Sequence, residues 1–315
     1  MTSNQSFKDH SIAPHAALLL VQIMFGTWPI FGKVVLRSMS STSLVSLRIF
    51  GAAIVFTLLQ RKLGELRQLP WRVLAWLLVS SLLGISINQF VFVKGLSLTT
   101  AINATLLITT IPVSTLVCSI ALGYDKASLR HFLGIALAAA GVIYLVDPWR
   151  ADFTGQTTLG NLLLIASSFS YGAYIAVSRN LFRRYGALSV ITWMFQIAAL
   201  LAIPIAAYSW STQGLSVITP GLGLAVVYII LVPTVGSYYL NSWAITRVSP
   251  SVVAVYIYLQ PLMAFGLAPL LLGESLNSRT IVACLLIFAG VAVVTIRSRS
   301  RAVEEISEHP DALTR

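Results

Sequence analysis

The apolar residues of the 315-residue chain are gathered into long runs, and this feature constrains its fold most strongly. Each run is bounded by a short polar cluster, and about 20 apolar residues are what a helix needs to cross the ~30 Å hydrocarbon core of a membrane. Apolar residues make up 57% of the chain and charged residues only 10%, whereas soluble domains carry about 25% charged residues. The pattern predicts a polytopic membrane protein without a sizeable soluble domain.

Ten runs can be placed along the chain, and each is predicted to be a transmembrane helix. They fall at about residues 16–37, 42–60, 72–94, 99–122, 130–147, 159–180, 187–208, 220–243, 248–272 and 279–297. The first run is longer than the apolar core of a signal peptide, so it is expected to stay as a span. Two halves of five spans, residues 16–148 and 159–297, are then flanked by polar tails at 1–15 and 298–315.

The distribution of basic residues predicts the orientation of the chain. Of its 21 Lys and Arg residues, fifteen fall on the side that holds both termini and five on the other, with Arg48 inside a span. Because loops rich in Lys and Arg stay in the cytoplasm, both termini are expected there, in a bacterial inner membrane. This reading also accounts for the net charge of +11, which in a soluble chain would suggest nucleic acid. No nucleic-acid partner is expected.

The two halves resemble each other at fixed offsets. At 149 residues, Pro112 aligns with Pro261, Asp125 with Glu274, Arg130 with Arg279, and Ala140-Gly141-Val142 with Ala289-Gly290-Val291. At 146 residues, Phe25-Gly26 aligns with Tyr171-Gly172 and Lys33 with Arg179. Since five is odd, the second half must enter the membrane from the opposite side. The predicted fold is therefore an all-α membrane protein of ten transmembrane helices in two inverted five-helix repeats, the arrangement used by alternating-access carriers.

These motifs resemble the drug/metabolite transporter superfamily, and specifically its ten-helix EamA-type members. The resemblance covers about residues 16–297 and rests on Phe25-Gly26, Lys33, Arg48, Pro112, Leu271-Leu272-Gly273-Glu274 and Phe288-Ala289-Gly290-Val291. It departs from the usual pattern where Asp125 replaces Glu, and Met194 stands opposite Arg48 in the second half. The resemblance implies a secondary transporter, not an enzyme, that exports a small metabolite such as an amino acid, an anionic solute or a drug, without a cofactor.

Arg48 is the most informative candidate for a binding site. It lies near the middle of the second span, where an Arg costs at least ~2.5 kcal/mol to insert. One interpretation is a cation that faces a central cavity and binds a carboxylate or phosphate. The other is an Arg that reaches to the interface or bonds to helix carbonyls. No span contains an acidic residue away from its ends that could pair with Arg48, and this favours the cavity.

Other polar and aromatic residues fall near the middle of the spans and are expected to share that cavity. The substrate-binding candidates besides Arg48 are Trp28, Asn103, Thr110, Tyr171, Gln196 and Gln260. Gln260 precedes Pro261, where a helix loses one backbone hydrogen bond. For each residue the alternative is an interhelical hydrogen bond worth about 0.6 kcal/mol.

Small residues recur in the fifth and tenth spans, where they permit close helix packing or a homodimer contact. No catalytic set, metal ligand cluster or nucleotide-binding loop is visible, and Cys118 and Cys284 lie alone in apolar runs. An intramembrane enzyme would need a nucleophile and a base at one depth. That enzyme and a channel remain the alternatives to a carrier, whose partners would be a small-molecule solute and membrane lipid.

Overall fold

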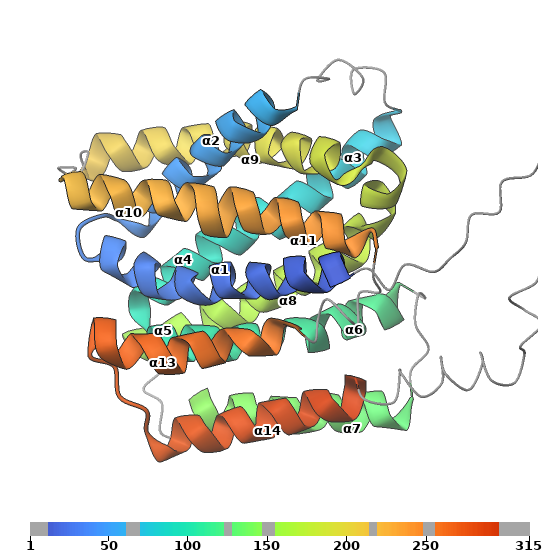
Figure 1. Ribbon diagram of the computed structural model, residues 1–315, viewed down its shortest axis with the longest axis vertical. Helices are drawn as coiled ribbons and strands as arrows, with labels where there is room; N and C mark the ends of the chain where they lie inside the picture. The colour runs from blue at the N-terminus through green and yellow to red at the C-terminus, as the bar shows by residue number, and fades with distance from the viewer. Residues whose placement is uncertain are drawn as a thin grey trace, which may run out of the picture.

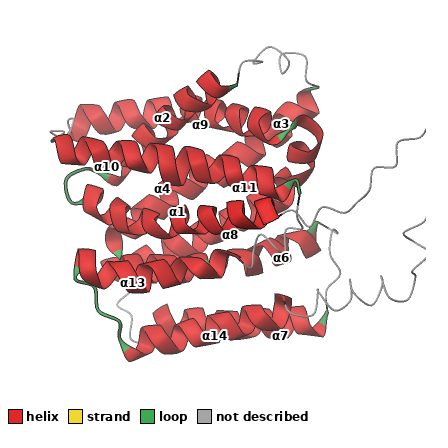
Figure 2. Cartoon of the chain, viewed as in Figure 1, coloured by secondary structure: helices red, strands yellow, loops and turns green. Residues whose placement is uncertain are grey.

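The computed structural model describes residues 12–60, 70–122, 128–146, 155–213, 219–247 and 256–295. Within these ranges every regular element is a helix and no strand occurs, which confirms the predicted all-α class (Figure 2). The unbroken helices are α1 (Ile12–Leu36), α2 (Ser41–Leu59), α7 (Leu129–Val146), α8 (Gln156–Tyr185), α9 (Ala187–Gln213) and α14 (Ser278–Thr295).

Four of the predicted spans contain a break in the α-helix. The third and eighth spans each carry a π-helical turn, and the fourth and ninth are interrupted near their middle. The pieces are α3 (Trp71–Ser81), η2 (Leu82–Ser86) and α4 (Ile87–Leu98); α5 (Ala101–Ile108) and α6 (Ile111–Ala121); α10 (Pro220–Ile230), η3 (Leu231–Gly236) and α11 (Ser237–Ile245); and the 3-10 turn η4 (Ile257–Leu259) with α13 (Gln260–Leu272).

The breaks recur at the offset seen in the sequence. The π-helical turn η3 begins 149 residues after η2, and Thr109-Thr110, between α5 and α6, aligns with the last two residues of η4. Proline explains the second pair, because Pro112 and Pro261 lie in the first turn of α6 and α13. A proline has no N–H, so the carbonyl four residues before it loses its helical partner. Those carbonyls belong to Ile108 and Ile257.

The helices pack side by side along one common direction (Figure 1). Close contacts join α4 to α8, where a Cβ on Gly95 would lie 2.9 Å from the carbonyl oxygen of Gly160. Any larger residue at position 95 would collide with this carbonyl oxygen, so the close packing of α4 against α8 requires glycine here. The pair α7 and α14 forms a separate layer (Figure 1), in which a Cβ on Gly141 would lie 3.0 Å from the carbonyl oxygen of Ala283.

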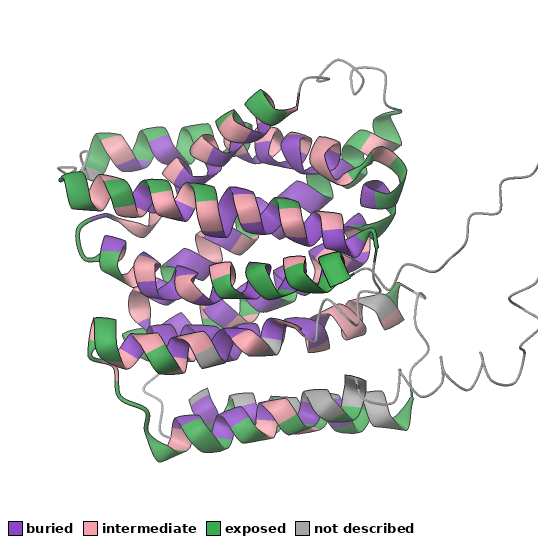
Figure 3. Cartoon of the chain, in the orientation of Figure 1, coloured by how far each residue is buried: buried purple, intermediate pink, exposed green. Residues whose placement is uncertain are grey.

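Many of the residues exposed on the outer faces of the helices (Figure 3) are large and apolar. Large side chains such as Leu224, Leu270 and Leu200 are 72%, 81% and 68% exposed, and a soluble monomer rarely shows so much apolar surface. Among the described residues, seven helices are long and apolar enough to cross a membrane. The fifth, ninth and tenth predicted spans fall on shorter apolar helices, so the count of ten stays a prediction.

The two ends of the bundle carry different parts of the chain. The start of α1 and the end of α14 lie at one end, and the connection from α13 to α14 lies at the other (Figure 1). We call the second end the Glu274 end, because Glu274 lies in that connection. It also holds Lys33, in the last turn of α1.

Candidate functional site

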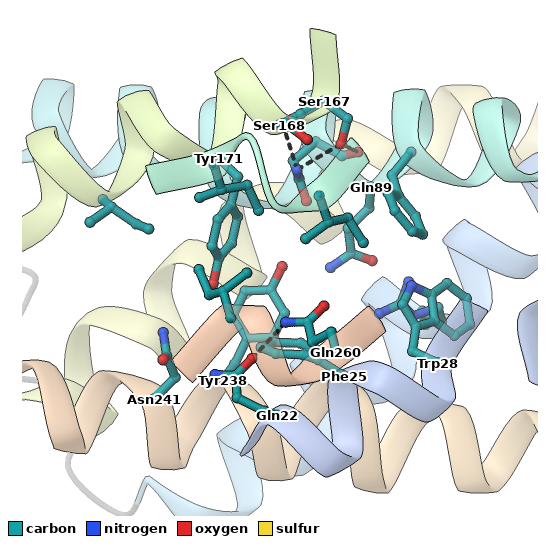
Figure 4. A pocket seen from close by; sticks show the side chains of 17 residues that line it. Gln22, Phe25, Trp28, Gln89, Ser167, Ser168, Tyr171, Tyr238, Asn241 and Gln260 are labelled. Carbon is teal, nitrogen blue, oxygen red and sulfur yellow. Dashed lines mark hydrogen bonds between the residues drawn. The ribbon is translucent and has the colours of Figure 1, made fainter. Parts of the chain in front are cut away.

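A cavity of about 80 Å³ lies in the middle of the bundle. It is several times larger than the roughly 10–15 Å³ that one water needs on the same kind of measure. Its walls come from both halves of the chain (Figure 4). The first-repeat wall consists of Gln22, Phe25, Trp28, Arg48, Asn88, Gln89, Phe92, Ile108 and Ile111. The second-repeat wall consists of Ser167, Ser168, Tyr171, Ile175, Tyr238, Asn241, Ile257 and Gln260.

Most lining residues occupy equivalent positions in the two halves. The offset of 146 residues pairs two residues of each wall, and the offset of 149 pairs four more. The pairs are Gln22 with Ser168, Phe25 with Tyr171, Gln89 with Tyr238, Phe92 with Asn241, Ile108 with Ile257, and Ile111 with Gln260. The cavity therefore lies at the interface between the repeats, where carriers of this architecture bind their solutes.

The paired positions differ in chemistry. The equivalent of Phe92 in the second repeat is Asn241, and the equivalent of Ile111 is Gln260. Arg48 has no polar equivalent at all, because Met194 stands at that position and is fully buried. A cavity with an equivalent backbone but unlike side chains can hold an asymmetric molecule in one orientation.

Arg48 lies in the wall of the cavity with only 3% of its surface exposed. Its Nε donates a hydrogen bond of 3.0 Å to Oγ1 of Thr234. The guanidinium carbon lies 3.8 Å from the centre of the Trp28 ring, a cation–π contact that is worth about 2 kcal/mol when desolvated. Both contacts leave the terminal guanidinium nitrogens without a hydrogen bond among the described residues. These nitrogens can bind an anion.

The π-helical turn η3 positions the partner of Arg48. In a π-helix the backbone bonds run from i to i+5, and the Thr234 hydroxyl donates at 2.7 Å to the carbonyl of Ile229, five residues earlier. The hydroxyl proton is thus used, and the oxygen is left to accept from Arg48. The arrangement holds the guanidinium against Trp28 instead of letting it reach toward the membrane surface.

Gln89 is the second lining residue, after Arg48, whose polar atoms are available to bind a ligand. Its side chain is 2% exposed, and neither its amide oxygen nor its nitrogen makes a hydrogen bond of good geometry among the described residues. The Tyr238 hydroxyl lies within reach of the amide but donates its proton to the carbonyl of Gly84. The amide points into the cavity beside Tyr238 (Figure 4). A buried polar group without a partner costs about 1–3 kcal/mol. Such a group is expected where a ligand or water supplies the missing partners.

Several of the remaining amides and hydroxyls of the cavity are hydrogen-bonded within the protein. Asn88 donates to the carbonyl and hydroxyl oxygens of Ser167 at 3.0 and 2.9 Å. Gln260 donates to Gln22 at 2.6 Å. The Tyr238 hydroxyl donates at 3.1 Å to the carbonyl of Gly84, which lies in the other π-helical turn, η2. These bonds tie the walls together.

Aromatic rings form much of the remaining surface. Tyr238 meets Phe25 and Tyr171 edge to face, with ring centres 6.0 and 6.5 Å apart. Trp28 lies 6.2 Å from Phe92. Such rings present flat apolar faces with polar rims. The cavity therefore suits a small organic molecule with an apolar body and one negative group.

Four of the seven residues proposed from sequence line this cavity, namely Arg48, Trp28, Tyr171 and Gln260. The other three lie elsewhere. Asn103 donates to Thr99 at 3.3 Å near the start of α5. The Thr110 hydroxyl bonds to the carbonyl of Leu107 at 2.6 Å. Gln196 bonds to the Ala53 carbonyl at 3.1 Å and to the Thr57 hydroxyl, joining α9 to α2.

Several lining residues were not among the sequence candidates. The most prominent are Gln22, Asn88, Gln89, Ser167, Ser168, Tyr238 and Asn241. Asn88-Gln89 was visible as two adjacent amides inside an apolar run. Gln89 and Tyr238 could also have been found together, because the offset of 149 residues joins them.

The long apolar helices, the exposed apolar surface and the central cavity at a repeat interface define a multi-pass membrane protein of the transporter class. The model of the EamA-like transporter family matches residues 14–146 and 158–296. The chain therefore belongs to the EamA-like transporter family, and the resemblance to the drug/metabolite transporter superfamily is confirmed.

Similar proteins carry transporter names. An uncharacterized transporter of Archaeoglobus fulgidus is 25% identical over 287 residues, which cover 90% of this chain and 97% of the relative. The WAT1-related protein At5g13670 of Arabidopsis thaliana is 23% identical, covering 89% of this chain and 83% of the relative. A probable amino-acid metabolite efflux pump of Salmonella typhimurium is 25% identical over 58% of this chain and 63% of its own. Relatives of this kind favour a transporter over an intramembrane enzyme.

The fold is also known from experiment. A solved crystal structure superimposes with a TM-score of 0.65 and covers 91% of this chain and 98% of its own, at 21% identity. At that identity the likeness shows the fold alone.

Proposed function

We propose that this transporter is a secondary carrier that exports a small organic anion, an amino acid or a similar carboxylate metabolite, across a bacterial inner membrane. The proposal rests on Arg48. Its guanidinium is buried at the interface of the repeats, and its terminal nitrogens have no hydrogen-bond partner among the described residues. A buried cation is stable only when it is paired. The solute would supply the pairing charge, and guanidinium binds carboxylate or phosphate with two parallel hydrogen bonds.

The shape and chemistry of the cavity narrow the solute further. Trp28, Phe25 and Tyr171 offer ring faces to an apolar body, and Gln89 offers one donor and one acceptor to a neutral polar group. Glu274 is the sole acidic residue among those described, and it does not line the cavity. An ammonium group of an amino acid would therefore contact rings and amide oxygens instead of a carboxylate. The printed name of the Salmonella relative supports an amino-acid-like metabolite.

Transport assays in proteoliposomes test this function. The purified chain is reconstituted and loaded with single unlabelled solutes, and entry of the same labelled solute is followed. We expect saturable counterflow for a small aromatic or branched carboxylate and none for its amide, because the amide cannot pair with Arg48. A flux that rises linearly with concentration and shows no counterflow would indicate a channel. Equal transport of the acid and its amide would overturn the role of Arg48.

The orientation is tested independently of any solute. The charge bias assigns the Glu274 end to the outside. Single cysteines at Arg184 and Leu276 should then react with an impermeant thiol reagent from opposite sides, Leu276→Cys from outside and Arg184→Cys from inside. Labelling of both from one side would contradict the inverted repeat.

A further inference from the structure

Glu274 joins two broken helices at their ends away from the cavity. Its two carboxylate oxygens accept from the backbone N–H groups of Ala101 at 2.7 Å and Ile102 at 3.0 Å. These are the first residues of α5, while Glu274 itself comes two residues after the end of α13. One side chain thus bridges the first and second repeats.

The contact is a strong one for chemical reasons. The free N–H groups at the start of a helix carry partial positive charge, and a carboxylate there makes charge-assisted hydrogen bonds. Thr100 accepts from Asn103 N–H at 3.0 Å, so the first turn of α5 has three of its free N–H groups satisfied. Lys33 adds a further attraction for Glu274 from α1.

The end of α13 aims Glu274 at its target. Gly273 adopts a left-handed conformation with φ of 71°, and its N–H bonds to the carbonyl of Pro269. The N–H of Glu274 bonds to the carbonyl of Ala268 at 3.4 Å. This is the glycine-dependent end of a helix, in which the chain turns sharply away from the helix axis. The turn directs the carboxylate sideways to α5.

Both bridged helices reach the cavity at their other ends. Ile108 ends α5 and lines the cavity, and Gln260 begins α13 and lines it too. A second pocket of about 320 Å³ lies at the Glu274 end, lined by Lys33, Leu36, Arg37, Ser97, Leu272 and Glu274. The bridge therefore lies in the wall of a pocket at this end of the bundle, and the two helices that it joins also form part of the cavity wall.

We propose that Glu274 is a latch that holds the Glu274 end of the transporter closed. The carboxylate keeps α5 and α13 together, and its two hydrogen bonds to Ala101 and Ile102 break whenever the cavity opens toward this end. The inference rests on the proposed carrier function only in requiring that the cavity open at both ends. Neither hydrogen bond involves the solute, so the latch acts on the closed-to-open equilibrium and not on solute affinity.

Thiol labelling of a cavity residue tests the latch without any solute. Cys118 and Cys284 are replaced by Ala, Ser168→Cys reports on the cavity, and the side of the Glu274 end is identified with Leu276→Cys. From that side, Glu274→Ala should raise the rate at which Ser168→Cys is labelled by about tenfold, which is ~1.4 kcal/mol in the opening equilibrium. Glu274→Gln, which keeps the shape and one acceptor oxygen, should give a smaller increase.

Asn277→Ala is the matched control. Asn277 lies in the same connection and accepts from the N–H of Thr280 at 2.8 Å, so it satisfies the start of α14 without bridging to α5. It should leave the labelling rate unchanged. Because removing a negative charge alone would favour an anionic reagent, labelling is repeated with a cationic one, and a latch predicts faster reaction with both.

Three results would overturn the latch. They are unchanged labelling in Glu274→Ala, equal acceleration by Asn277→Ala, and opposite effects on the two reagents. Since labelling needs no solute, faster labelling with no counterflow for any carboxylate would sink the proposed function and leave the latch standing. Normal counterflow of a carboxylate, together with unchanged labelling in Glu274→Ala, would support the proposed function and overturn the latch.

Discussion

The two walls of the cavity are equivalent in backbone and unlike in chemistry. Both contain a π-helical turn and a helix broken before a proline, at the same offset. The first-repeat wall adds the guanidinium of Arg48 and the free amide of Gln89, where the second repeat has the thioether of Met194 and the phenol of Tyr238. The comparison suggests that the helix breaks shared by both repeats allow the helices to move during transport. The side chains of the first repeat then bind the solute. Exchanging residues between equivalent positions tests this division.

Arg48→Met, which makes the two positions identical, should have the largest effect. We expect transport of a carboxylate to fall by about 100-fold or more, because truncating one member of a buried charge pair costs about 2–5 kcal/mol. The measurement is initial counterflow in proteoliposomes with matched protein content. Met194→Leu is the control at the equivalent position and should transport normally, because that swap nearly conserves volume. If the Arg48 variant disappears from the membrane, the residue is structural instead.

Gln89→Leu should lower transport without lowering stability. The lost hydrogen bonds to the solute should reduce transport by roughly fivefold to tenfold, whereas removing an unpartnered buried amide should leave the melting temperature equal or higher. Thermal unfolding in detergent and counterflow measure the two effects.

Gln196→Leu is the contrasting variant. Gln196 is a half-buried amide, but it is bonded to α2 and lies outside the cavity. It should lose stability by about 1 kcal/mol and keep its apparent solute affinity. If the two variants change alike in both stability and transport, Gln89 does not bind the solute.

Ile111→Gln copies the second-repeat residue Gln260 onto the first-repeat wall. Both residues line the cavity, and the substitution nearly preserves side-chain length. We expect transport to stay within about threefold, with the preference among solutes shifted toward more polar ones. Competition among unlabelled carboxylates measures the shift. A loss as large as that of Arg48→Met would mean that the broken helix tolerates no polar side chain at this point.

The smallest effect is expected from pH. In the sequence no span carries a carboxylate or a histidine away from its ends, since Asp147 is the last residue of the fifth predicted span. Arginine stays charged at any physiological pH. Exchange with saturating solute on both sides should therefore change by less than about twofold between roughly pH 6 and pH 8. Uphill accumulation of a solute of fixed charge, driven by a pH gradient alone, would point to a titrating group in the transport path.

Much of the fold could be predicted because it rests on local patterns. Apolar runs of span length predict membrane helices whatever their partners, and Pro112 and Pro261 predict a break because each lacks one N–H. The π-helical turns η2 and η3 were not predicted. Nothing local in Leu82–Ser86 requires one, and the carbonyls of Leu83 and Gly84 in η2 accept from the distant residues Ser170 and Tyr238.

Part of the candidate site could also be predicted, because some of its residues are unusual in their local sequence. Arg48 stood out because a charge inside a span has few explanations. Asn103, Thr110 and Gln196 looked equally central by depth, but depth along a helix does not say which face meets the cavity. Gln196 turns toward α2 and bonds there, and that face is set by packing against a neighbour 139 to 143 residues away in sequence.

The sequence by itself determined the helical membrane class, the duplication and the presence of Arg48 inside a span, because each follows from composition or from spacing along the chain. The tertiary structure alone decided which amides are left without partners and that Glu274 reaches α5. Those outcomes depend on which side chains meet across helices that are far apart in the chain. A hydrogen bond needs its two atoms within about 3 Å, and no periodicity in the sequence can specify such a distance between separate helices.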